Sequence, residues 1–296
     1  MTPAAIPEAR RQDRRQGRRQ RGHEQGQPQG QERRTEPHHE LWALFAIAQR
    51  DLIRLLRDRY RLALSLAFPL FLIVGVGNVV GPLLEGTGSP GGVTFVFTGI
   101  LAATLFQSAA AGIVSIVEDR ETDFSRELFV APVSRITIVA GKVVGESLVA
   151  ATQGVGIVAI APLLGVRISL PQALALVPPG LAACLLGAAF GLATVAWLPS
   201  QRTAMQVFTF LIVPQYVLAG VVAPVQALPA ALDIVSRLMP LRYAVDLLRS
   251  VFDAGSPGLV AVGPESPIVD VLAVSALVVV LMGAGTWAFD RRERSR

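Results

Sequence analysis

Charged residues are scarce in this sequence, and histidine and cysteine are scarcer. Of 296 residues only 17% are charged, whereas soluble domains typically carry about 25%. A single cysteine, Cys184, excludes an intramolecular disulfide and a cysteine metal cluster. All three histidines lie in the first 40 residues. We therefore expect no catalytic residue and no metal site in the rest of the chain.

Apolar runs are the main feature of the remaining sequence. Hydrophobic residues make up 52% of it, and they gather in runs of roughly 20 residues, enough for a helix to cross a hydrocarbon core of ~30 Å. A soluble protein with buried helices would need polar faces that these runs lack. We expect an all-α integral membrane protein whose six transmembrane helices occupy a domain at 62–289. The expected spans are 62–84, 93–117, 136–166, 173–198, 203–223 and 268–289.

Two segments precede the first span. Residues 1–40 are rich in arginine and glutamine and have no apolar core, so they are expected to form a disordered basic tail. This tail either touches anionic lipid or is a dispensable extension. Segment 41–61 is expected to form an interfacial amphipathic helix, with its apolar face in lipid and its arginines toward the headgroups. The apolar face comprises Leu41, Phe45, Ala48, Leu52 and Leu55, and the opposite face Arg50, Arg54, Arg57 and Arg61.

The distribution of arginine predicts the orientation. Six spans place both termini on one side, and most arginines lie on that side, in segments 1–61 and 118–135 and in the tail 290–296. Because positive charge marks the cytoplasmic side, we expect a multi-pass protein of the cell membrane with both termini in the cytoplasm. The arginines lie where a membrane protein places them, so membrane lipids are expected partners and nucleic acid is not.

The expected external segment, 224–254, is too amphipathic for an ordinary loop. Pro229 and Pro240 are each placed to begin a short helix. The second helix would carry a stripe of alternating charge at helical spacing, formed by Arg242, Asp246, Arg249 and Asp253. We expect a re-entrant helix pair before the last span, with an exposed external hairpin as the alternative.

A short charged segment, 118–135, separates the second and third spans. Thr122 is a plausible N-cap and Pro132 ends the helix. The resulting amphipathic helix, at about 122–133, has an apolar face that includes Phe124 and Leu128. The acidic residues around it disfavour contact with anionic lipid, so a cytoplasmic protein is the expected partner.

The stretch DFSRELFVAPVSRITIVAGKVVGESLVA resembles permease subunits of type-2 ATP-binding-cassette (ABC) exporters, and VAPVSR resembles their daunorubicin-resistance branch. The stretch LPAALDIVSRLMPLRYAVDLLRSVF is similar to the family's segment before the last span, although Met239 and Arg242 depart from the usual Asn and Thr. The resemblance implies two permeases, expected to form a homodimer, with two ATPase subunits below. The segment at 122–133 would then be the cytoplasmic coupling helix. The implied ATPase-coupling residues are Glu118, Asp119, Arg120, Glu121, Phe124, Arg126, Leu128, Phe129, Pro132 and Arg135.

The chain itself is not expected to hydrolyse ATP. A phosphate-binding loop needs G-x-x-x-x-G-K-[ST], but Val143 follows Gly141-Lys142, and Ile136 stands where the first glycine belongs. The chain is thus expected to be no enzyme and to bind no cofactor, with ATP and magnesium on the partner ATPase.

Polar groups inside the spans are candidates for the transport path, because ionisable groups in hydrocarbon are costly. Glu146 either forms a solvated pair with Lys142 or lies on the translocation seam, where it would attract cations. The amides either line the seam or bond between helices. The possible seam residues are Asn78, Gln107, Glu146, Gln153, Gln206 and Gln215. Gly187 and Gly191 have the spacing of a close helix contact.

These observations favour a permease that exports a drug-like, lipid or glycan substrate with a separate ATPase. A non-transporting membrane anchor or sensor that recruits a cytoplasmic protein is the alternative. An ion-coupled secondary transporter ranks below both, because it would need acidic residues deep in several spans.

Overall fold

The computed structural model describes residues 37–84, 91–121, 135–198, 200–225, 228–254 and 266–294, and every regular element in these ranges is helical. The longer helices are α2 (Pro37–Arg57), α3 (Arg59–Leu84), α4 (Gly92–Glu121), α6 (Arg135–Ile160), α8 (Val177–Val195), α9 (Gln201–Leu218) and α12 (Pro267–Arg294). The shorter ones are η1 (Ala161–Leu164), α7 (Leu170–Ala175), α10 (Ala230–Arg237) and α11 (Pro240–Ala254). The expected tail up to residue 36 and the coupling helix at 122–133 lie outside the described residues.

Five helical stretches in the described residues are long and apolar enough to cross a membrane. They are Leu62–Pro82, Gly92–Val114, Val139–Leu164, Leu170–Val195 and Pro267–Ala288. The expected span at 203–223 is not among them. Helix α9 has only 18 residues and includes Arg202 and Gln206. It ends at Leu218 because Gly220, with φ of 77°, turns the chain.

Helix α4 is the centre of the bundle. In its apolar stretch 78% of the residues are buried, against 17% in those of α3 and α12. Helices α3, α6, α8, α9 and α11 all pack against α4. Its buried aromatic residues Phe95, Phe97 and Phe106 anchor a continuous apolar core. Helices α3 and α12 therefore present most of their apolar surface outward.

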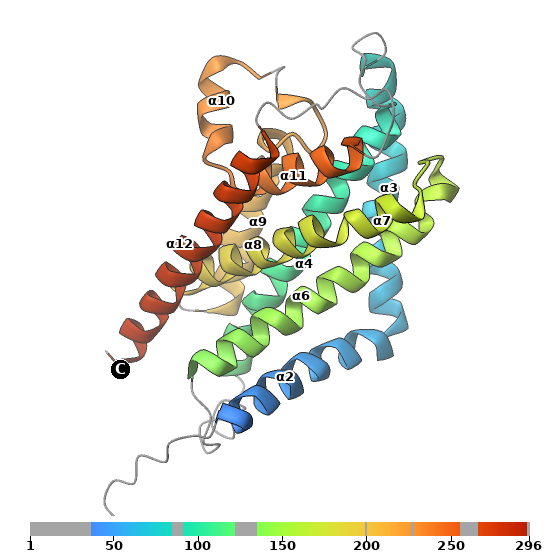
Figure 1. Cartoon of the computed structure of the whole chain (residues 1–296). Coiled ribbons are helices and arrows are strands. Elements are labelled where there is room, and N and C mark those ends of the chain that lie inside the picture. The colour runs from blue at the N-terminus through green and yellow to red at the C-terminus, as the bar shows by residue number, and fades with distance from the viewer. Residues whose placement is uncertain are drawn as a thin grey trace, which may run out of the picture. The chain divides into compact units, whose positions relative to one another are not determined.

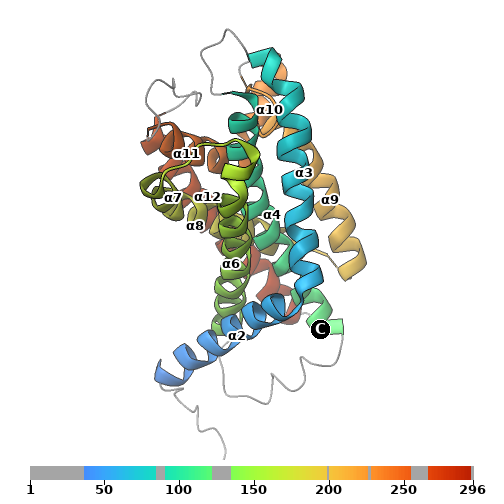
Figure 2. The same ribbon diagram turned by 90° about the vertical axis from the view of Figure 1, so that its right-hand side faces the viewer.

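The elements sort toward two ends (Figures 1 and 2). Helix α2, the last turn of α4, the first turn of α6 and the end of α12 lie at one end, and α10 and α11 lie toward the other. Helix α2 packs along α6. The two helices that flank the charged segment 122–134 therefore meet at the end that α2 occupies.

Helix α2 is not the two-faced helix that the sequence predicts. Ala48 and Leu55 of the expected lipid face are buried within the bundle, together with Asp51. Phe45, expected on the same face, is exposed. It belongs to an exposed apolar stripe of Trp42, Phe45, Ile53 and Leu56. Helix α2 thus has a protein-facing side, an exposed apolar stripe and an arginine side.

Helix α8 crosses α4 at a contact that only small residues allow. A Cβ atom on Gly187 would overlap the carbonyl oxygen of Phe106. A Cβ atom on Gly191 would lie 2.5 Å from the carbonyl oxygen of Ala110. The close contact predicted from the spacing of these glycines is confirmed.

We expect Gly187→Ala to destabilise the protein by about 1–3 kcal/mol, because the added methyl group meets backbone that cannot move aside. Thermal unfolding in detergent measures this loss. Gly283→Ala on α12 is the matched control, since nothing lies within 4 Å of a Cβ there. Equal unfolding temperatures for the two variants would contradict the close crossing.

Candidate functional site

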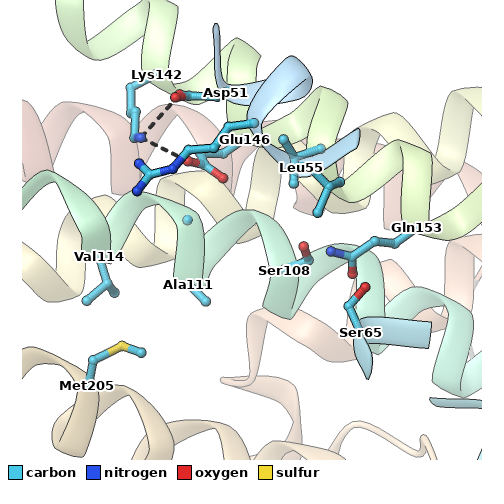
Figure 3. Close-up of a pocket in the computed structure, with 13 residues that line it drawn as sticks. Asp51, Leu55, Ser65, Ser108, Ala111, Val114, Lys142, Glu146, Gln153 and Met205 are labelled. Carbon is cyan, nitrogen blue, oxygen red and sulfur yellow. Dashed lines mark hydrogen bonds and ion pairs between the residues drawn. The ribbon is translucent and has the colours of Figure 1, made fainter. Parts of the chain in front are cut away.

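A buried ion cluster joins α2 to α6 (Figure 3). Lys142 Nζ lies 3.1 Å from Asp51 Oδ2 and 3.0 Å from Glu146 Oε1. Lys142 and Glu146 are one turn apart on α6, whereas Asp51 comes from α2 between the buried residues Ala48 and Leu55. The pairing of Lys142 with Glu146 agrees with the sequence. Its surroundings differ from those of a solvated pair, because the side chains of Lys142 and Glu146 are only 9% and 11% exposed.

The cluster extends to two arginines of α2. Arg50 Nη2 lies 3.2 Å from Asp51 Oδ1, and Arg54 lines the same cavity as Lys142 and Glu146. Buried ion pairs add little net stability, but removing one partner is costly because it leaves a charge without compensation. The cluster therefore fixes where α2 sits on α6 more than it stabilises the fold.

Two glycines make room for this contact. A Cβ atom on Gly145 of α6 would lie 3.0 Å from the Ala48 Cα, so α2 approaches α6 closely beside Asp51. A Cβ atom on Gly112 of α4 would overlap the Glu146 carboxylate. Glu146 thus packs against α4, and the cluster lies at the junction of three helices.

The cluster lines a cavity of about 350 Å³ that also contacts α3 and α9, through Ser65 and Met205. A second cavity of about 220 Å³ shares four lining residues with the first, Ser65, Ser108, Ala111 and Gln153. The polar side chains of Ser65, Ser108 and Gln153 lie close together in Figure 3. The two cavities, together called the hollow below, thus lie side by side along α4 and share these polar side chains, although most of the other residues that line the second cavity are apolar.

The predicted seam residues separate into two groups. Glu146, Gln153 and Gln107 all line this hollow, and Gln107 accepts a hydrogen bond of 2.8 Å from Tyr216 on α9. The other three lie elsewhere: Asn78 is exposed and bonds its own helix at Val74 O, Gln206 is exposed on α9, and buried Gln215 accepts a bond from the Leu241 backbone amide.

Helices α10 and α11 form a second charged cluster toward the other end. Arg242 Nη1 lies 2.9 Å from Asp233 Oδ1 and 2.7 Å from Ser236 Oγ, and Asp246 is 3.8 Å from Arg242 Nε. The Ser236 hydroxyl in turn donates to the carbonyl of Leu218 at the end of α9. All four residues of the predicted charge stripe on α11 are buried. An exposed hairpin is therefore wrong for α11, since its charged and apolar faces are both covered by protein.

Arg249 joins three segments. Its guanidinium stacks 3.8 Å from the centre of the Phe95 ring. The same side chain donates to Thr98 Oγ1, to the Phe95 carbonyl and to the Val221 carbonyl. Arg249 thus holds α11 and the turn after α9 onto the start of α4.

Comparison with known proteins identifies the family. The family model described as "ABC-2 type transporter" matches residues 43–252. The chain belongs to this family. Nodulation protein J of Rhizobium meliloti (strain 1021) is 29% identical over 209 residues, which is 67% of this chain and 76% of the relative. A putative transport permease, ycf38, of Cyanophora paradoxa is 25% identical over 217 residues, 72% of this chain and 75% of the relative. The protein is a multi-pass membrane protein and a transport permease component.

The coupling residues implied for an ABC-2 permease lie around the gap between α4 and α6. Glu118, Asp119, Arg120 and Glu121 end α4, and Arg135 begins α6, although the side chains of these five are not described. The other five, Phe124, Arg126, Leu128, Phe129 and Pro132, lie outside the described residues. Their role stays a prediction.

Sequence reasoning missed Asp51 and underrated Lys142. Asp51 stands three residues after Ala48 and four before Leu55, so helical spacing alone places it on the buried side of α2. A carboxylate on such a side needs a cation, but the spacing in the sequence pairs Lys142 only with Glu146. Tyr216 and Ser108, which line the hollow, carried no signal in the pattern.

We expect Lys142→Met to destabilise the ABC-2 permease by about 3–5 kcal/mol, because Asp51 and Glu146 stay buried without the lysine. Thermal unfolding in detergent and faster hydrogen exchange in α2 measure the effect. The neutral triple variant, Asp51→Asn with Lys142→Met and Glu146→Gln, should regain most of the loss. An unchanged unfolding temperature for Lys142→Met would contradict the cluster.

The second cluster predicts a dependence on pH. Hydrogen bonds from Arg242 first, and then from Arg237, hold the pKa of Asp233 below its usual 3.8. Because the folded pKa is the lower one, this stabilisation is present above pH 3.8 and is lost as pH falls through the folded pKa. Unfolding temperatures of wild type and Asp233→Asn should differ at neutral pH and converge in acid. A difference that does not change with pH would exclude this role for Asp233.

Proposed function

We propose that this chain is the permease subunit of an ATP-driven exporter that works with a separate ATPase subunit. The family implies an ATPase partner for such a transporter. Two permease copies and two ATPase copies form the proposed assembly. Segment 122–133 is its coupling helix, with the apolar face of Phe124 and Leu128 against the ATPase.

The observation that carries this proposal is the ion cluster of Asp51, Lys142 and Glu146. A movement of segment 122–134 passes into α6, whose first residue is Arg135. Lys142 lies about two turns further along α6 and is bound to α2 through Asp51. Glu146 packs against Gly112 on α4, the other helix that flanks the segment. A push on the coupling helix thus reaches α2, α4 and α6 together, beside the hollow.

The end of the bundle that α2 occupies is proposed to face the cytoplasm. Both chain termini would then lie on the cytoplasmic side of the cell membrane. The proposed sixth span is α9, whose 18 residues extend about 27 Å and so nearly match the hydrocarbon core. Helices α10 and α11 would then form the re-entrant pair on the external side. The buried charges of α11 support this, because they are satisfied within the protein and need no water.

The transported substrate is proposed to be drug-like, lipid or glycan, and to leave along the hollow lined by Gln107, Glu146 and Gln153. The VAPVSR motif supports the drug-export branch. The polar part of the lining combines hydroxyl and amide groups, among them Ser65, Ser108 and the two glutamines, with the charged residues beside the ion cluster. A substrate with hydrogen-bonding groups fits this lining better than a plain hydrocarbon.

The test is to change Phe124 and Leu128 together to Asp. We expect copurification with the ATPase and transport to fall to background, because two charges replace the buried apolar contact. Membrane insertion, measured by fractionation, should stay at the wild-type level. Co-expression with the ATPase and affinity purification measure the complex.

The control places the same change where no ATPase is expected. Ile234 and Leu238 are 67% and 72% exposed and lie outside segment 118–135 and outside the five apolar stretches long enough to cross a membrane. Changing both to Asp should leave the complex intact. Persistence of the complex in the Phe124 and Leu128 variant would refute the coupling assignment. A complex that forms without transport of any substrate would favour the membrane-anchor alternative.

A further inference from the structure

The bend between α2 and α3 forms a cavity lined mainly by arginines. It measures about 560 Å³ and is open to the surroundings. The residues lining it, here called the arginine elbow, are Arg50, Ile53, Arg54, Arg57, Asp58, Arg59 and Tyr60. Four arginine side chains therefore contribute to one opening, together with a single acidic residue.

The backbone explains why these side chains converge. Helix α2 ends at Arg57 and α3 begins at Arg59, with Asp58 between them. The Asp58 amide donates to Leu55 O at 3.1 Å, and the Asp58 carbonyl accepts from Leu62 N at 3.0 Å. One residue thus belongs to the hydrogen bonding of both helices. The last turn of α2 and the first residue of α3 consequently line the same opening.

Helix dipoles explain only part of this charge. Arg54 and Arg57 lie in the last turn of α2, where a cation is favourable. Arg59 is the first residue of α3, where a cation is unfavourable, and the first turn of α3 contains no acidic residue. Arg50 already contacts Asp51 of the ion cluster. The excess positive charge at the elbow therefore suits an external anion.

The position of the elbow indicates which anion. The apolar stretch Leu62–Pro82 begins two residues after Tyr60, and Leu64 and Phe68 are both exposed. On α2 the exposed apolar stripe includes Ile53 and Leu56, directly beside the arginines in sequence. Arginine and tyrosine at the end of a span are typical of the depth of lipid headgroups. The elbow lies where apolar surface meets positive charge on both helices.

We propose that the arginine elbow binds the phosphate of an anionic phospholipid. Arginine presents a planar fork of donors that matches phosphate oxygens. Clusters of arginine next to a span attract anionic lipid. The acyl chains would lie along the exposed apolar side chains of α3, and Tyr60 would flank the headgroup. This inference needs a membrane protein but not the proposed ATPase coupling.

Lipid in the elbow would also contact the ion cluster. Arg54 lines both the elbow and the cavity beside Glu146. Arg50 lines the elbow and pairs with Asp51. A bound phosphate therefore shares two arginines with the contact that positions α2.

The test measures lipid binding to the full-length chain by native mass spectrometry in detergent, with phosphatidylglycerol and phosphatidylcholine as probes. The variant is Arg57→Gln with Arg59→Gln, which leaves Arg50 and Arg54 beside the cluster. We expect phosphatidylglycerol binding to weaken roughly 25-fold, because each arginine near an anionic surface strengthens binding about fivefold. Phosphatidylcholine binding should not change. The unfolding temperature without lipid should match that of wild type.

The control removes the same charge elsewhere. Arg202 on α9 and Arg291 on α12 are both exposed, and changing both to Gln should alter phosphatidylglycerol binding less than twofold. If both double variants lose phosphatidylglycerol binding equally, the lipid responds to the overall positive charge of the protein and not to the elbow, and the proposal is overturned. Unchanged binding in the elbow variant would also overturn it.

Two further outcomes identify another occupant. Competition by millimolar inorganic phosphate would show a soluble anion and not a lipid. The elbow variant could instead lose copurification with the ATPase and still bind phosphatidylglycerol. That result would show that the elbow contacts an acidic protein surface. The proposed function fails separately, through the Phe124 and Leu128 variant, so the two failures are distinguishable.

Discussion

The contact on which the rest of the account depends is one lysine between two carboxylates from different helices. Lys142 is within 3.1 Å of Asp51 and 3.0 Å of Glu146. Because a buried charge without a partner is costly, α2 cannot slide or rotate on α6 without breaking this contact. Helix α2 is thus a fixed part of the bundle, although its sequence is typical of a helix that floats on a membrane surface.

This constraint connects the features of the molecule to transport. Segment 122–134 is flanked by α4 and α6, and both helices contribute to the cluster region, through Gly112 on α4 and Lys142 on α6. The hollow begins at the same place and extends along α4, the most buried helix. Toward the other end, Arg249 and Arg242 fix α11 to its neighbours. In the proposed mechanism, force applied to segment 122–134 would therefore reach the hollow through α4 and α6.

The sequence predicted the elements of the fold better than their environment. Apolar runs located five of the helical spans, and Pro240 marked the start of α11. The spacing of Gly187 and Gly191 predicted the contact of α8 with α4. The helical spacing of residues in α2 predicted two faces, one apolar and one rich in arginine. The helix has three, because part of the expected apolar face packs against protein. For α11 the spacing left two environments open, because an amphipathic helix looks the same whether its charged face meets water or buried polar partners such as Ser236 and Thr98.

The parts of the candidate site that the sequence did not predict depend on contacts between residues far apart in the chain. Asp51 and Lys142 are 91 residues apart, and nothing local to either indicates the other. The hollow is similarly assembled from α2, α3, α4, α6 and α9, each of which contributes only one to a few polar side chains. The most direct test of the account measures amide hydrogen exchange of α2 in the assembled transporter, with and without ATP, in wild type and in Lys142→Met. If the cluster holds α2 and α6 as one unit, wild-type α2 has the same protection in both nucleotide states, and Lys142→Met loses that protection. Protection of α2 that changes with nucleotide in wild type, or that is unchanged in Lys142→Met, would contradict the account.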